Sequence, residues 1–216
     1  VKLHAMIDCP FVQIGSSEVY GSMDHPAKEY SALNPSSPYA ISKAAFDQHL
    51  LVMHRVKGSQ VKIVRPSNCY GPGQQLHRII PKTLVSCLAG RKIELHGGGK
   101  ARKSYLHTDD LSSAIMTIIE KGVDGEVYNV GPDQPTSIRE VVARCVEIMN
   151  REWEDCVVEA PERTGQDSTY WIDSSKLKAL GWEKIVGWEE GLSDMVDWIE
   201  AYPELKDMPT DYVMRP

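Results

Sequence analysis

Tyr39 and Lys43 stand four residues apart in the stretch SPYAISK, and their spacing is the first sign of chemistry in this chain. On a helix, residues i and i+4 share a face, so the phenol and the ammonium point into the same space. An isolated phenol has a pKa of about 10, and a neighbouring cation lowers the pKa of a phenol because it stabilises the phenolate. Such a tyrosine can exchange a proton with an alcohol while a hydride moves to a nicotinamide.

A second group of reactive side chains lies upstream, in FVQIGSSEVYG at residues 11–21. The apolar run predicts a short buried strand that ends in a polar turn at Ser16, Ser17 and Glu18. The Ser16 hydroxyl can both donate and accept a hydrogen bond, so it can follow a proton in either direction. A carboxylate at a strand end inside a cleft has its pKa raised by desolvation, which suits Glu18 to be a general base. A turn-forming serine and a solvated loop glutamate are the alternative interpretations.

The elements that must position these groups alternate along the chain. Ser37-Pro38 predicts a helix start, and Gly58 ends that helix after about Lys57. Further buried strands are predicted at 61–64, 93–95 and 125–130, and further helices at 109–121, 137–150 and 189–201. Thr108 is expected to cap the helix at 109–121, and Ser137 with Glu140 to form a capping box. Strands that alternate with helices indicate an α/β fold with a mainly parallel sheet.

Composition narrows the class of partner. The chain has 216 residues, of which 42% are hydrophobic, and a net charge of −6, which argues against nucleic acid or an anionic membrane surface as the main partner. No apolar run is long enough to span a bilayer. The five cysteines form no C-x-x-C pair and predict reduced thiols in the cytoplasm. No spacing of histidines predicts a metal site.

Seven stretches together resemble the extended short-chain dehydrogenase/reductase family, the NAD-dependent nucleotide-sugar epimerases and dehydratases. These stretches are GSSEVYG, SPYAISKAAFD, VRPSNCYGPG, GRKIELHGGG, SYLHTDDL, GEVYNVG and DSSKLKALGW. The resemblance implies a truncated Rossmann-like, doubly wound parallel sheet with a smaller C-terminal α/β substrate lobe. Residues 1–66 and 104–130 would form the remainder of the NAD-binding domain. Residues 67–103 and 131–216 would form the nucleotide-sugar-binding lobe, interleaved with it.

The resemblance also implies roles for individual residues. Tyr39 would be the base, Lys43 would hold the nicotinamide ribose, and Ser16 would bond the substrate 4-hydroxyl. In sugar 4,6-dehydratases the position matching Glu18 removes the C5 proton, and Ser17 stands where the dTDP-glucose enzymes carry an acidic residue. For NAD the implied contacts are Ser16, Tyr39, Lys43 and Cys69, and for the nucleotide diphosphate sugar they are Asn68, Arg78, Lys103, Asn129 and Arg163.

Within this family, RTGQDSTYWID at 163–173 is most similar to dTDP-glucose 4,6-dehydratases. The implied reaction is a nucleotide-sugar 4,6-dehydration. A 4-epimerase or a UDP-glucuronate decarboxylase-like enzyme is the alternative, because serine at position 17 is a poor acid. The family's Gly-rich dinucleotide segment is absent from this sequence, so a fragment is expected, and a truncated, non-catalytic nucleotide-sugar-binding lobe is a further alternative. The family also implies a homodimer through a four-helix bundle.

Overall fold

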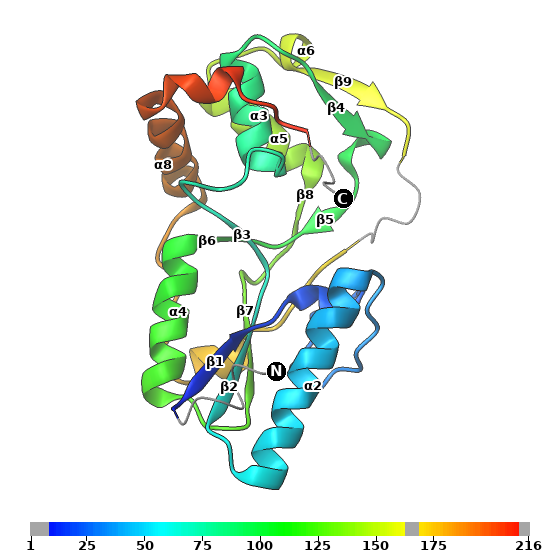
Figure 1. Ribbon diagram of the computed structural model, residues 1–216. Coiled ribbons are helices and arrows are strands. Elements are labelled where there is room, and N and C mark those ends of the chain that lie inside the picture. The colour runs from blue at the N-terminus through cyan, green and yellow to red at the C-terminus, as the bar shows by residue number, and fades with distance from the viewer. Residues whose placement is uncertain (1–8, 163–168, 212–216) are drawn as a thin grey trace. The chain divides into compact units, whose positions relative to one another are not determined.

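The computed structural model describes residues 9–162 and 169–211 (Figure 1). The chain divides into two compact units, each built from three segments. Unit 1 comprises residues 1–69, 103–135 and 167–185, and unit 2 comprises 70–102, 136–166 and 186–216.

Unit 1 is built on a parallel sheet with the strand order β1-β2-β7. The strands are β1 (Phe11–Ile14), β2 (Val61–Pro66) and β7 (Val127–Val130). Phe11 of β1 pairs with Val61 in β2, and Ile63 of β2 pairs with Val127 in β7. Five of the six residues in β2 are buried, as expected for a central strand of a parallel sheet. The predicted Rossmann-like parallel sheet is confirmed.

Helices cover both faces of this sheet, because side chains alternate along β2. Val61 and Ile63 pack with Leu50 of α2 (Pro38–Lys57). Val64 faces the other way and packs with Ile118 of α4 (Thr108–Lys121). Figure 1 shows α2 and α4 on either side of the strands, which is the doubly wound arrangement.

The ends of α2 follow the sequence signals. The Ser37 hydroxyl accepts a hydrogen bond from Ala40 N at 3.1 Å, and Gly58 ends the helix in the left-handed conformation with φ 68°. The predicted cap of α4 was wrong by one residue. Thr108 is the first helical residue, and His107 caps the helix by accepting a hydrogen bond from Asp109 N at its Nδ1 atom. An imidazole nitrogen can replace the usual hydroxyl because it also carries a lone pair.

Unit 2 contains a two-stranded parallel sheet and packed helices. The strands β4 (Ile93–His96) and β9 (Val157–Ala160) pair with each other. The helices are α3 (Ile79–Leu88), α5 (Ile138–Ile148), α6 (Trp153–Cys156) and α8 (Trp188–Ala201). Apolar side chains of β4, α3 and α5 form one buried cluster with Cys156 and Val157. Ser137 and Glu140 form the predicted capping box at the start of α5.

Short elements complete the chain. They are η1 (Ser17–Tyr20), β3 (Asn68–Tyr70), η2 (Gly97–Gly99), β5 (Arg102–Lys103), β6 (Tyr105–His107), β8 (Thr136–Ser137), α7 (Ser175–Lys178) and η3 (Pro203–Asp207). No helix in the described ranges 9–162 and 169–211 is long and apolar enough to cross a bilayer.

Residues 67–69, 103, 131–135 and 169–185 fall in unit 1, whereas the predicted boundaries placed them in the second lobe. Packing explains this placement. Leu177 and Trp182 are buried in the same cluster as Ile118 of α4, and Ile172 forms a parallel bridge with Ala27. Residues 169–185 therefore return to complete the core of unit 1.

Candidate active site

Tyr39 and Lys43 lie near the start of α2, on the same face of the helix. The Lys43 ammonium is 5.8 Å from the centroid of the Tyr39 ring, and Tyr39 is 51% exposed. Lys43 Nζ also donates a hydrogen bond of 2.9 Å to the carbonyl of Ile14, the last residue of β1. The predicted pairing of phenol and cation is therefore present, and the cation is anchored to the sheet.

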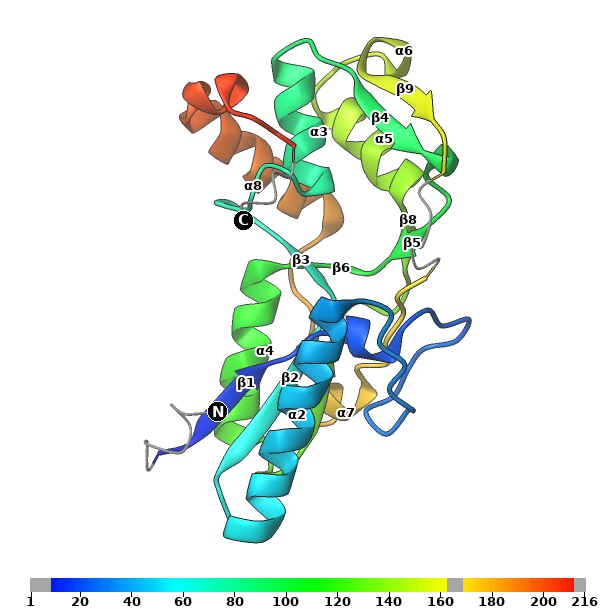
Figure 2. The ribbon, with the colours of Figure 1, turned by 45° about the vertical axis from the view of Figure 1, so that its right-hand side comes forward.

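Ser16, Ser17 and Glu18 follow the carboxyl end of β1 directly. The Ser16 hydroxyl accepts a hydrogen bond of 3.2 Å from Glu18 N and thereby caps η1. Ser16 and Ser17 are buried, whereas Glu18 is half-buried. Since η1 packs against α2, and Lys43 bonds the carbonyl two residues before Ser16, the two predicted catalytic motifs meet in unit 1. Figure 2 shows α2 running beside β1 and β2.

Asn68 and Cys69 follow the carboxyl end of β2. The backbone nitrogen of Asn68 donates to Ser104 O at 3.0 Å, and Cys69 Sγ donates to Ser67 O at 3.4 Å. Burial raises the pKa of the Cys69 thiol to about 12. Cys69 is therefore a neutral thiol at physiological pH, and it can contact a cofactor without acting as a nucleophile.

Lys103 is buried, with its Nζ 3.4 Å from the centroid of the Tyr170 ring. A cation over an aromatic face is stabilised by the ring quadrupole. Arg163, which is also predicted to contact the nucleotide diphosphate, lies outside the described residues.

Asn129, predicted to contact the substrate, is fully buried in β7. Its Oδ1 accepts a hydrogen bond of 2.8 Å from the Tyr20 hydroxyl, and its Nδ2 donates one of 3.0 Å to Ala27 O. Its backbone nitrogen donates to Glu29 Oε1 at 3.0 Å. These contacts tie the segment 20–29 to the sheet, and the substrate-binding role of Asn129 stays a prediction.

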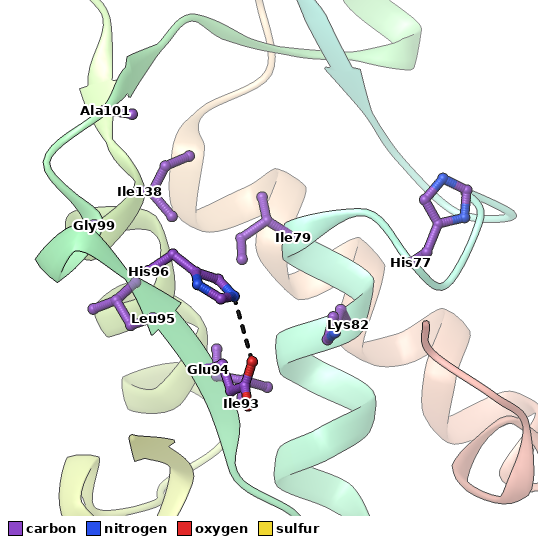
Figure 3. Close-up of a pocket in the computed structure, with 10 residues that line it drawn as sticks. All are labelled: His77, Ile79, Lys82, Ile93, Glu94, Leu95, His96, Gly99, Ala101 and Ile138. Atoms are coloured by element: carbon purple, nitrogen blue, oxygen red, sulfur yellow. Dashed lines mark ion pairs between the residues drawn. The ribbon is translucent and has the colours of Figure 1, made fainter. Parts of the chain in front are cut away.

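Arg78 belongs to unit 2 and precedes the first residue of α3. Its sequence neighbours His77 and Ile79 line a cavity of about 190 Å³ between α3 and β4. Figure 3 shows the His96 ring and Glu94 of β4 in this cavity, with His96 Nε2 3.4 Å from a Glu94 carboxylate oxygen. The cavity therefore offers apolar walls and a few polar groups, as small-molecule sites do, although Arg78 itself is not among its lining residues.

Three buried polar residues behind Lys43 were missed by the sequence reasoning: Tyr20, Asp47 and Arg65. Arg65 Nε donates to Asp47 Oδ2 at 2.9 Å, and Arg65 Nη1 donates to the Tyr20 hydroxyl at 2.8 Å. One signal was available, because Asp47 stands one helical turn after Lys43 and shares its face.

Comparisons with known proteins identify similar chains. Residues 3–131 match the profile of the NAD dependent epimerase/dehydratase family. A dTDP-glucose 4,6-dehydratase from Streptomyces griseus is 35% identical over 194 residues, which cover 89% of this chain and 59% of the relative.

Solved structures agree with this match. The dTDP-glucose 4,6-dehydratase of Bacillus anthracis, in complex with NAD, superposes with a TM-score of 0.85 and is 34% identical, covering 90% of this chain and 63% of that one. A UDP-glucose 4-epimerase of Thermotoga maritima with UDP-glucose also gives 0.85, at 29% identity, with 90% and 64% covered. The chain thus spans less than two thirds of the length of these proteins.

Proposed function

This chain belongs to the NAD-dependent epimerase/dehydratase family, and from that premise we propose that the protein carrying it is a nucleotide-sugar 4,6-dehydratase. The observation that supports the proposal most is the meeting of Lys43 and Tyr39 of α2 with the end of β1, directly before Ser16 and Glu18. This is the carboxyl end of a parallel sheet, where ligands bind in folds of this type. The exposed Tyr39 ring and the nearby ammonium fit the nicotinamide ribose of NAD.

In the proposed mechanism, Lys43 stabilises the phenolate form of Tyr39, which takes the proton of the sugar 4-hydroxyl and becomes the neutral phenol. Ser16 holds the same hydroxyl in line. Tyr39 and Lys43 would hold the nicotinamide ribose of NAD, which would supply the hydride acceptor and donor for the sugar. The 4-keto group makes the C5 proton acidic and Glu18 removes it. The C6 hydroxyl then takes that proton from Glu18 and leaves as water, and a C5–C6 double bond forms. Ser17 would lie beside this leaving hydroxyl.

Ser17 is also the residue that supports an alternative. A buried serine protonates a leaving hydroxyl poorly. A 4-epimerase or a UDP-glucuronate decarboxylase-like enzyme needs no such acid. A nucleotide-sugar-binding lobe without redox chemistry is a third reading.

Isotope exchange distinguishes these readings. We expect the full-length protein, incubated in heavy water with dTDP-, UDP- and GDP-linked hexoses in turn, to release a 4-keto-6-deoxy sugar that carries deuterium at C5. Inverted C4 stereochemistry without C5 exchange would identify an epimerase instead, and loss of carbon dioxide from a UDP-glucuronate substrate would identify a decarboxylase. Binding of a nucleotide sugar without any turnover would support the non-catalytic reading.

The cavity beside Arg78 is our candidate for the nucleotide end of the substrate. An arginine fork suits the oxygens of a diphosphate, and the apolar side chains of Ile79, Ile93 and Ile138 suit a base. Asn68, Lys103, Asn129 and Arg163 are the other proposed contacts of the nucleotide sugar.

The proposed assembly is a homodimer through α2. Three apolar side chains of this helix, Ile41, Val52 and Val56, are exposed at 55%, 43% and 74% and share one face. We expect light scattering of the full-length protein to report a dimer, and Val52→Glu with Val56→Glu to convert it to a monomer because two charges cannot be buried unpaired. A wild-type monomer at micromolar concentration would contradict this.

The five free thiols support a cytoplasmic location.

A further inference from the structure

Asp47 is a completely buried carboxylate on α2, one turn beyond Lys43. Its Oδ2 atom accepts a hydrogen bond of 2.9 Å from Nε of Arg65, whose side chain is itself 2% exposed. Arg65 is held in turn by the Tyr20 hydroxyl, which donates onward to Asn129. The carboxylate is therefore fixed from behind by a strand residue and a buried network.

Both carboxylate oxygens of Asp47 lie close to Gly15, the residue that follows β1. A Cβ atom added to Gly15 would lie 3.1 Å from Asp47 Oδ1 and 3.2 Å from Oδ2, so a larger residue here would press against the carboxylate. Within the described part of the chain, Oδ1 is buried and has no hydrogen-bond partner. Gly15 follows Ile14, whose carbonyl accepts the hydrogen bond from Lys43 Nζ. Two residues of α2, one turn apart, thus contact two consecutive residues at the end of β1, namely its last residue Ile14 and the following Gly15.

Charge links Asp47 to Lys43 as well. Burial raises the pKa of the Asp47 carboxyl, while the Arg65 guanidinium and, to a smaller extent, the Lys43 ammonium lower it. Asp47 is fully buried and Lys43 is half-buried, so water screens the attraction between their charges less than it would at the surface. Arg65, Asp47 and Lys43 therefore form a row of alternating charges that ends beside Tyr39.

Stability alone does not account for this row. A buried ion pair costs so much desolvation that apolar residues of similar volume often serve the fold as well or better. We propose that Asp47, held by Arg65, is a positioning residue that sets the place of the Lys43 ammonium beside Tyr39. The inference rests on the proposed function, in which that ammonium supports the hydride-transfer step.

Replacement of the whole pair separates positioning from folding. In the full-length protein, Asp47→Leu with Arg65→Met should leave the melting temperature near that of the wild type. The rate constant for NADH formation in a single turnover with nucleotide sugar should fall by about tenfold to about a hundredfold. A folding defect would lower the amplitude of NADH formation, because the amplitude measures the number of active sites. It would leave the rate constant unchanged. An unchanged rate constant would overturn the proposal.

A matched control lies on the same strand. Lys62 Nζ is 2.8 Å from Asp124 Oδ1, in a pair that is also largely shielded from solvent. Lys62→Met with Asp124→Leu removes this pair and should leave the rate constant unchanged. An equal loss in this control would show a general effect of ion-pair removal and would overturn the specific role of Asp47.

Asp47→Asn gives a second route if the double variant does not fold, since it keeps the volume and an acceptor for Arg65. The same fall in rate constant is expected, with little change in substrate affinity, because Asp47 does not touch substrate. Crystal structures supply a readout that does not depend on activity. Lys43 Nζ should leave Ile14 O in Asp47→Asn, and retention of that hydrogen bond would refute the inference even if the wild type oxidises no nucleotide sugar. Absence of NADH formation in the wild type would count against the proposed function instead.

Discussion

Tyr39→Phe should lower the rate of NADH formation, and with it turnover, by about 10²- to about 10⁴-fold, the usual contribution of a positioned general base. The substitution removes one hydroxyl and leaves the ring on the exposed side of α2. The helix itself should be unaffected, because Ser42 bonds the backbone carbonyl of Tyr39 and not its side chain. Oxidation at C4 comes first, so the loss is expected in a dehydratase and in an epimerase alike. Stopped-flow absorbance of NADH in the full-length protein measures it.

A matched control for this variant is Tyr30→Phe. Tyr30 is 83% exposed and lies outside the proposed catalytic group, so its hydroxyl should be dispensable. If Tyr39→Phe retains the wild-type rate of NADH formation, another group is the base and the proposed mechanism fails at its first step.

Glu18→Gln should separate the second step from the first. The amide has the size of the carboxylate and cannot accept the C5 proton, whereas Tyr39 and Lys43 remain in place. We therefore expect the variant to form NADH and a 4-keto sugar at near wild-type rates and to release no 4-keto-6-deoxy product. Its turnover should fall by about 10²-fold or more, and deuterium should no longer enter C5 from heavy water.

Glu183→Gln, at an exposed position of the same unit, is the control for charge removal. Its product release should match that of the wild type. Near wild-type turnover of Glu18→Gln would show that Glu18 is a bystander, and the epimerase alternative would then gain the support that the dehydratase loses.

Local signals predicted the elements that hold the catalytic pair. Ser37 and Gly58 mark the ends of α2 because their side-chain and backbone preferences act within a few residues. The same holds for the capping box at Ser137. Spacing alone placed Tyr39 and Lys43 on one face, which the structure confirms.

Features that depend on distant partners were not predictable in this way. Arg65 and Asp47 are 18 residues apart, and nothing in either local pattern shows that they pair. The strand β9 was also missed. Two of its four side chains are exposed, so it has no strong apolar pattern, and it forms by pairing with β4. His107 is the N-cap of α4 in place of the expected Thr108, since a hydroxyl and an imidazole at adjacent positions can both accept a hydrogen bond from the first turn of the helix.

The division of each unit into three segments has a consequence for synthesis on the ribosome. The core of unit 1 includes Leu177 and Trp182, so β2 is translated more than a hundred positions before part of the core into which it packs. During that interval the apolar faces of β2 and α4 lack part of their cover, the situation in which nascent chains depend on chaperones. Neither unit is a contiguous stretch of the gene, so a single cut between residues 70 and 185 divides both units. Slow codons or a stalled ribosome before residue 185 should therefore expose more aggregation-prone surface than the same delay after it.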